Sequence, residues 1–96
     1  MLSIPQRKQL RALAHSLKPV VLVGKKGFSQ ALLDETNAAL LAHELIKIKF
    51  QEAALEETDK IVQDLCQELT VDLVEKRGHV VTLYKPHPQK PKIKLA

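Results

Sequence analysis

Two glycines bracket two lysines in the segment Gly24-Lys25-Lys26-Gly27, and the chain contains only one other glycine. Glycine permits positive φ angles and the close approach of another backbone, and a lysine ammonium group is a point charge that suits a phosphate. The segment follows an apolar run and precedes Ser29, which can cap a helix whose first amide groups also favour an anion. This spacing indicates a phosphate-binding turn, although an ordinary solvated turn between a strand and a helix could have the same four residues.

The other residue types that could do chemistry are scattered along the chain. Cys66 is the single cysteine and the four histidines form no i, i+4 pair, so no metal-ligand spacing occurs. The residue order of a P-loop is missing around Gly24, and Ser3 and Ser29 are better explained as helix caps than as nucleophiles. We therefore expect no enzymatic activity, no catalytic residue, no metal or other cofactor and no small-molecule substrate.

The composition is that of a small globular domain. The chain has 96 residues, of which 45% are hydrophobic and 27% are charged, which is enough for one hydrophobic core but too short for two. No apolar stretch approaches the roughly 20 residues of a membrane-spanning helix, and the N-terminal residues lack the apolar core of a signal peptide. We expect a protein that does not bind membranes and stays in the cytoplasm.

The charges are distributed unevenly along the chain. Residues 1–50 contain eight Lys/Arg and three Asp/Glu, residues 51–69 contain one and six, and residues 70–96 contain six and two. The three segments therefore carry +5, −5 and +4, within a formal net charge of +4. Segregation of this kind predicts a basic face that attracts a polyanion and an acidic helix placed away from that face.

A first helix is expected over residues 3–17, because Ser3 and Gln6 fit a capping box and Pro19 closes the helix. With 3.6 residues per turn, its apolar residues share one sector and its basic residues the adjoining one, so one face should pack while its neighbour is positive. The apolar set is Leu10, Leu13, Ala14 and Leu17, and the basic set is Arg7, Lys8, Arg11, His15 and Lys18.

The middle of the chain predicts two strands around a second helix. Residues 20–23 are all apolar, as in an interior strand covered on both faces, and the Gly-Lys-Lys-Gly turn follows them. Ser29 can cap a helix that runs to about residue 41. Residues 45–50 alternate with period two, which places Lys47 and Lys49 on the exposed face of a strand.

The last part of the chain predicts a third helix, a hairpin and a tail. The helix covers residues 54–69, and its outer surface is acidic. Residues 71–74 and 80–84 form two strands joined through Lys76-Arg77-Gly78, where Gly78 can take a positive φ. The acidic residues of the helix surface are Glu56, Glu57, Asp59, Asp64 and Glu68.

This element order, αβαβαββ, predicts an α+β sandwich. The strand-helix-strand unit requires a parallel pair with a right-handed crossover, and the hairpin adds antiparallel pairing, so the sheet should be mixed, four-stranded and packed with three helices. Residues 1–85 form one domain, and residues 86–96 form a basic tail rich in proline and lysine that we expect to be extended and flexible.

The basic features converge on nucleic acid, and RNA is the favoured kind. The turn, the cations of the first helix, the two strand lysines and the Lys76-Arg77 pair together favour one basic binding surface. The chain has two Phe, one Tyr and no Trp, so it offers no row of aromatic side chains on which bases could stack. No helix-turn-helix or zinc-finger spacing points to double-stranded DNA. Recognition should rest on backbone and shape.

Several ordered segments resemble the CRM domain family (chloroplast RNA splicing and ribosome maturation), in the stand-alone bacterial form called YhbY-like, over about residues 2–85. Lys85 stands where the family commonly has arginine, and Lys76-Arg77-Gly78-His79 departs from its usual apolar-Gly-Arg turn. The segments that carry the resemblance are Leu10-Arg11-Ala12-Leu13-Ala14-His15, Leu17-Lys18-Pro19-Val20-Val21, Val23-Gly24-Lys25-Lys26-Gly27, His43-Glu44-Leu45-Ile46-Lys47-Ile48-Lys49 and Leu83-Tyr84-Lys85.

The resemblance implies a fold similar to the C-terminal domain of bacterial translation initiation factor three, and RNA binding through the GxxG loop and the basic surface beside it. It also implies association with pre-50S ribosomal particles in large-subunit assembly, with 23S rRNA or its precursor as the RNA. By motif position, the loop residues are Gly24, Lys25, Lys26 and Gly27. The nearby cations added to them are Arg7, Lys8, Arg11, Lys18, Lys47, Lys49 and Lys85.

The acidic third helix leaves a second hypothesis open. A module that binds proteins could use this helix to dock a basic partner such as a ribosomal protein, because its carboxylates are concentrated within residues 51–69.

Overall fold

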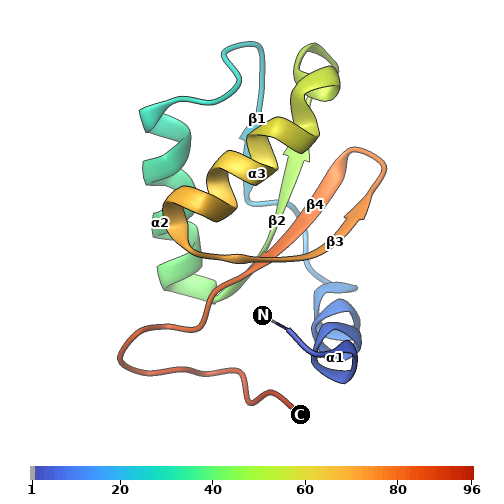
Figure 1. Ribbon diagram of the computed structural model, residues 1–96, viewed down its shortest axis with the longest axis vertical. Coiled ribbons are helices and arrows are strands. Elements are labelled where there is room, and N and C mark those ends of the chain that lie inside the picture. The colour runs from blue at the N-terminus through green and yellow to red at the C-terminus, as the bar shows by residue number, and fades with distance from the viewer. Residues whose placement is uncertain (1) are drawn as a thin grey trace.

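Four strands form one mixed sheet in the computed structural model, which describes residues 2–96 (Figure 1). The sheet order is β1-β2-β4-β3, with β1 parallel to β2 and the remaining pairs antiparallel. This confirms the predicted α+β class, the element order and the mixed four-stranded sheet packed with three helices. The strands are β1 (Val21–Val23), β2 (Leu45–Phe50), β3 (Asp72–Arg77) and β4 (Val80–Tyr84).

The helices are α1 (Ile4–Ala14), α2 (Gln30–His43) and α3 (Thr58–Leu69), with a 3-10 helix, η1 (Glu52–Glu57), ahead of α3. The predicted caps are present. Ser3 and Gln6 form a reciprocal capping box, and the Ser29 hydroxyl accepts the Leu32 N–H at 3.1 Å. None of the helices within residues 2–96 is long and apolar enough to cross a membrane.

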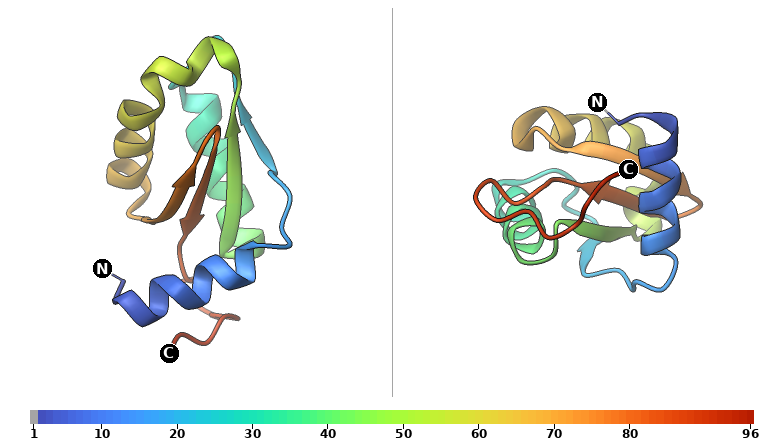
Figure 2. Two further views of the ribbon diagram at one scale, coloured as in Figure 1. Left: turned by 90° about the vertical axis from the view of Figure 1, so that its right-hand side faces the viewer. Right: turned by 90° about the horizontal axis from the view of Figure 1, so that it is seen from below.

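The two faces of the sheet are covered differently. Helices α2 and α3 pack on one face, where Ile48, Phe50, Ile61 and Leu65 belong to the main hydrophobic core. Helix α1 lies across one end of the opposite face (Figure 2), where Leu10 and its neighbours form a second, smaller core cluster. The rest of this second face carries no helix, and we call it the open face. The smaller cluster consists of Leu10, Ala14, Leu45, Val74 and Tyr84.

Two sequence predictions about the helices need correction. Helix α1 ends at Ala14 instead of residue 17, because the chain turns at His15 and Ser16 and then leads into β1. Leu13 and Leu17, predicted to pack, are therefore 46% and 37% exposed. The helix predicted over residues 54–69 is divided at Thr58, where η1 ends and α3 begins.

The strand β1 also differs from the prediction. It is an edge strand, paired with β2 alone, and not an interior strand covered on both faces. Val21 and Val23 are buried against α2 and α3, but Leu22 and the preceding Val20 are 57% and 50% exposed. Although residues 20–23 are all apolar, one side of this strand therefore faces solvent.

The C-terminal tail contains no helix or strand, but it folds back onto the domain and is held by a buried carboxylate. Glu44 is 1% exposed and accepts backbone N–H groups of the tail from His87 and Lys92, both at 2.7 Å, and from Ile93 at 3.1 Å. The tail also packs Ile93 and Leu95 against the smaller core cluster. Sequence reasoning anticipated neither the role of Glu44 nor these contacts.

Candidate nucleic-acid interface

The Gly24–Gly27 loop is a tight exposed turn between β1 and α2, at one end of the molecule (Figure 1). The Gly27 N–H donates to the Gly24 carbonyl at 3.0 Å, and Gly27 has a φ of 62°, in the left-handed region that favours glycine. Lys25 and Lys26, at the two central positions, are both exposed. The turn therefore presents two free ammonium groups to solvent, as the sequence predicted.

The start of α2 adds backbone donors beside these lysines. Ser29 satisfies the Leu32 N–H through its hydroxyl and the Leu33 N–H through its carbonyl. The amide groups of Gln30 and Ala31 have no acceptor within the helix, and the positive end of the helix dipole lies here. The loop, Leu22 and the first turn of α2 line a hollow of about 270 Å³. Its size and donors suit a phosphate group.

Acidic side chains lie closer to this loop than the charge pattern suggested. A Cβ placed on Gly27 would stand 3.3 Å from the Glu57 carboxylate, and Glu35 lines the hollow. The sequence predicted an acidic helix placed away from the basic face. This prediction is wrong at Glu57, which lies at the N-terminal end of α3 and beside the loop. Both carboxylates limit how deeply an anion can settle and direct it toward the outer side of the loop, where Lys25 and Lys26 lie.

The strand lysines lie on the open face as predicted. Lys47 pairs in register with Thr82, and Lys49 pairs with Val80 and, on its other side, with Leu22. Paired residues of adjacent strands point to the same side of a sheet, so these side chains share the open face. Leu22 immediately precedes the end of β1 that leads into the loop, which places Lys49 one strand away from the loop hollow.

The predicted cations of α1 are not beside the loop, because α1 and the loop lie toward opposite ends of the molecule's long axis (Figure 1). Arg11 reaches the end of the open face, and Lys8 and Lys18 are exposed. Arg7 is engaged within the protein, where its Nη1 donates to the carbonyls of Leu73 and Val74, the latter at 3.0 Å. This geometry gives Arg7 a structural use, holding α1 to β3.

Lys85 lies at the end of the sheet away from the loop. It follows β4, at the end of the sheet where Leu45 pairs with Tyr84, and its backbone N–H donates to the Glu44 carbonyl at 2.9 Å. The structure therefore groups the loop with Lys49 and Lys47, and places Arg11 beyond them at the α1 end. Lys85 is not part of that group.

Arg77 is an open-face cation that the sequence assigns to the basic surface as part of the Lys76-Arg77 pair but does not single out as an RNA-binding residue. It pairs in register with Val80, opposite Lys49, whereas the neighbouring Lys76 points to the helix side and binds Asp59 at 2.6 Å. Alternation along β3 could have predicted that Lys76 and Arg77 point to opposite faces of the sheet. Which of the two faces each one takes could not be predicted, because the register shifts at Val74, between Leu73 and Glu75. Within residues 2–96 no cluster of His, Cys, Asp and Glu could hold a metal ion.

Comparison with known proteins assigns the family. A model of the CRS1 / YhbY (CRM) domain matches residues 2–85. The chain belongs to the CRS1/YhbY (CRM) domain family. A probable RNA-binding protein of Pseudomonas aeruginosa is 34% identical over 84 residues, which cover 88% of this chain and 81% of that protein. An RNA-binding protein of Haemophilus influenzae is 39% identical over 85 residues, covering 88% and 86%.

Two further matches extend over almost the whole chain. A probable RNA-binding protein of Bacillus subtilis is 32% identical over 95 residues, covering 99% of both proteins. The solution structure of a hypothetical protein from Staphylococcus aureus superposes with a TM-score of 0.82 at 25% identity and covers 100% of both chains. These matches agree with the resemblance seen in the sequence segments and with the observed fold.

Proposed function

We propose that this CRM-domain protein binds RNA and grips its phosphate backbone with the Gly24–Gly27 loop. The observation that carries the proposal is the pairing of two exposed lysines with the positive end of α2 around one hollow. Backbone donors, a helix dipole and ammonium groups all favour a phosphate, and none of them reads a base. The names of the relatives, which describe RNA-binding proteins, support RNA as the ligand.

The RNA partner that we propose is 23S rRNA or its precursor within pre-50S particles. Support for this partner comes from the family resemblance and from the exposed lysines and helix-end amides at the loop, which suit an RNA held by its phosphate backbone. A protein of this kind would act in large-subunit assembly as a binding factor and not as an enzyme.

Replacing Lys25 and Lys26 by alanine tests the loop. If each lysine neutralises one phosphate, the double variant should lower RNA affinity about tenfold or more and make the slope of log K against log salt shallower by about 1.4. The loss should be similar for RNAs of different sequence, because phosphate contacts carry no sequence information. Fluorescence anisotropy with a labelled oligouridine, measured over a series of salt concentrations, provides both numbers.

The matched control removes the same charge from the helix side. Lys60 pairs with Asp64 at 3.2 Å and Lys76 with Asp59 at 2.6 Å, so Lys60→Ala/Lys76→Ala lowers the net charge equally without touching the loop. The control should keep its RNA affinity within about twofold of the wild type. Loss of these two exposed ion pairs should also change the free energy of unfolding only slightly. Equal losses in both variants would reduce the effect to net charge and remove the loop from the mechanism.

The alternative function, docking of a ribosomal protein through the acidic third helix, receives less support. Asp59 and Asp64 already pair with Lys76 and Lys60, and Glu57 lies beside Gly27. Charge reversal at Glu56 and Asp64, which leaves Glu57 beside the loop unchanged, separates the two functions. Loss of ribosome association with RNA affinity intact would favour the protein partner.

A further inference from the structure

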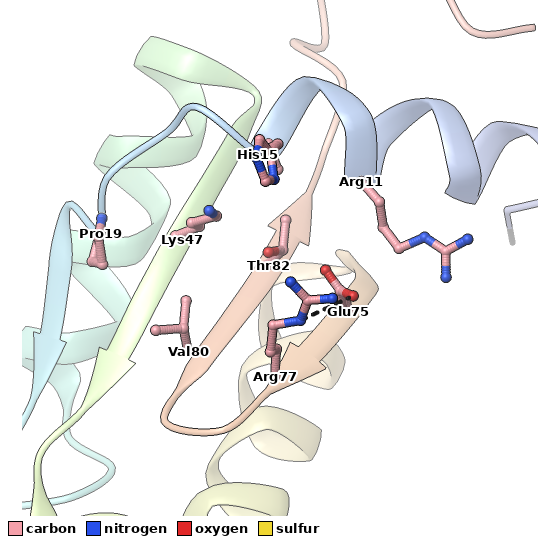
Figure 3. A pocket seen from close by; sticks show the side chains of 9 residues that line it. Arg11, His15, Pro19, Lys47, Glu75, Arg77, Val80 and Thr82 are labelled. Carbon is pink, nitrogen blue, oxygen red and sulfur yellow. Dashed lines mark ion pairs between the residues drawn. The ribbon is translucent and has the colours of Figure 1, made fainter.

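A cleft separates the C-terminal end of α1 from the open face of the sheet (Figure 3). It has a volume of about 210 Å³, and its polar lining includes His15 from α1, Lys47 from β2, Thr82 from β4 and Arg77 from β3. Arg11 lies at its outer rim, where its side chain extends away from Arg77 (Figure 3). Helix α1 and three strands of the sheet thus contribute to one hollow on the α1 side of the open face.

Sheet register explains why these residues meet. Lys47 and Glu75 flank Thr82 from the two neighbouring strands, and Lys49 and Arg77 flank Val80 in the same way. Both rows therefore lie side by side on the open face. Helix α1 crosses the end of this face and adds its own polar side chains to the cleft.

The charges in the cleft favour an anion. Lys47 and Arg77 face the single carboxylate of Glu75, whose Oε1 lies 3.9 Å from the Arg77 Nε. That pair is long and the Arg77 side chain is 81% exposed, so the pair is weak. The other N–H groups of the guanidinium remain available, and their planar arrangement matches two oxygens of one phosphate.

We propose that this cleft is a second phosphate site, and that it holds the same RNA strand whose backbone the loop grips. The inference rests on the proposed function of the loop. It assigns to the protein an RNA segment that runs across the open face, from the loop hollow over Lys49 to Arg77 and Lys47. A shorter ligand can occupy only one of the two sites.

One cross-strand row connects the two sites. Leu22 lines the loop hollow, pairs in register with Lys49, and is followed across the sheet by Val80 and Arg77, which line the cleft. The distance from β1 to β3 is three strand spacings, roughly 14 Å. Lys49 is exposed midway along the row and can neutralise a phosphate between the two ends. The exposed Leu22 offers an apolar contact for a sugar or base.

An RNA strand fits this surface better than an acidic peptide. The central strands β2 and β4 are paired on both sides, so an extended peptide lying over them finds no free strand edge to pair with. A phosphodiester strand needs only the cations and the open surface.

The test compares two RNA lengths and three variants. Fluorescein-labelled oligouridines of about 2 and about 16 nucleotides are compared. The dinucleotide, with one internal phosphate, is too short to reach both sites, and the longer strand is at the upper end of the site sizes of compact single-strand binding folds. Lys47→Gln/Arg77→Gln removes the cleft cations but keeps long side chains over the sheet, and Lys60→Gln/Lys76→Gln is the matched control on the helix side. Lys76 and Arg77 are neighbours in sequence with opposite orientations, which makes the comparison local.

The proposal predicts that lengthening the RNA strengthens binding to the wild type and to the control alike, and that the cleft variant loses about tenfold of this gain. Lys47→Arg/Arg77→Lys, which restores both charges, should recover most of it and shows that the loss is not caused by unfolding. A cleft variant with the wild-type length dependence would overturn the inference, while the effect of the loop variant would still support the proposed function.

Two other outcomes would also overturn the inference. Equal weakening of short and long RNA by the cleft variant would mean that the two sites do not share a strand. Binding of an oligoglutamate peptide that depends on Lys47 and Arg77, with no effect of these residues on RNA, would assign the cleft to an acidic protein. If the loop variant also bound RNA as the wild type does, the proposed function itself would fall.

Discussion

At the scale of single residues, the two glycines of the loop have different roles. Gly27 has a φ of 62°, which any residue with a Cβ adopts at a cost. Gly24 has no such φ, and a Cβ there would meet only the end of the Gln51 side chain, at 2.7 Å from its Oε1, which can rotate away. The sequence identified the turn but could not tell which glycine is required, because that depends on φ.

Gly27→Ala should destabilise the protein by about 1 kcal/mol and weaken RNA binding, because the strained turn can no longer hold its lysines in place. The free energy of unfolding of Gly24→Ala should stay within about 0.5 kcal/mol of the wild type, because the flexible Gln51 side chain can rotate away from the added methyl group. Urea denaturation midpoints, together with oligouridine affinities, measure both effects. Equal stability of the two variants would show that the left-handed φ of Gly27 is not needed.

At the scale of elements, caps and periodicity in the sequence predict the four strands and the three α-helices, but they predict neither η1 nor which elements are neighbours. The run at residues 20–23 predicts an interior strand because both of its sides are apolar. Which strand occupies an edge depends on the sheet order, and the local sequence does not contain that order. The same limit applies to α1, whose cations were grouped with the loop by charge alone and lie at the other end of the molecule.

The C-terminal tail is held by an element junction that the sequence did not reveal. Glu44 ends α2 with a φ of 64° and turns its carboxylate toward the tail. Burial acts to raise the pKa of Glu44, but hydrogen bonds from the backbone N–H groups of His87, Lys92 and Ile93 outweigh burial and hold the pKa below its ordinary value. A carboxyl with a lowered pKa is stabilising while it is ionised in the folded state.

Glu44→Gln should destabilise the protein by about 1–3 kcal/mol at neutral pH, because one of the two oxygens that accept tail N–H groups becomes an NH₂ donor. Glu68 is exposed on α3, and Glu68→Gln is the matched control, which should leave the free energy of unfolding unchanged. Urea denaturation gives the difference in the free energy of unfolding. A variant as stable as the control would exclude Glu44 as the anchor of the tail.

The same anchor has a defined pH dependence. Its contribution is fully present above the pKa of an unfolded glutamate, about 4.3, and is lost as the pH falls through the lowered pKa of the folded state. The stability difference between wild type and Glu44→Gln should therefore be constant near neutral pH and shrink only below about pH 4.

At the scale of the whole molecule, the charge pattern of the sequence predicts a polyanionic ligand, in agreement with the names of the RNA-binding relatives, but it is a poor guide to the arrangement of cations. The basic residues of the first half divide between the loop, the open face and α1, and Glu57 of the acidic segment reaches the loop. Arg77 joins the open face although the segment that contains it departs from the family pattern. The fold, and not the order of charges, brings Lys49, Lys47 and Arg77 onto one surface.

The most direct test of the central claim is an NMR titration of the ¹⁵N-labelled protein with an oligouridine of about 16 nucleotides. If the loop grips the phosphate backbone, the largest amide shifts should occur at Gly24–Gly27 and at Gln30 and Ala31, the first turn of α2. Shifts concentrated on α3, with the loop and the first turn of α2 unchanged at saturation, would contradict it.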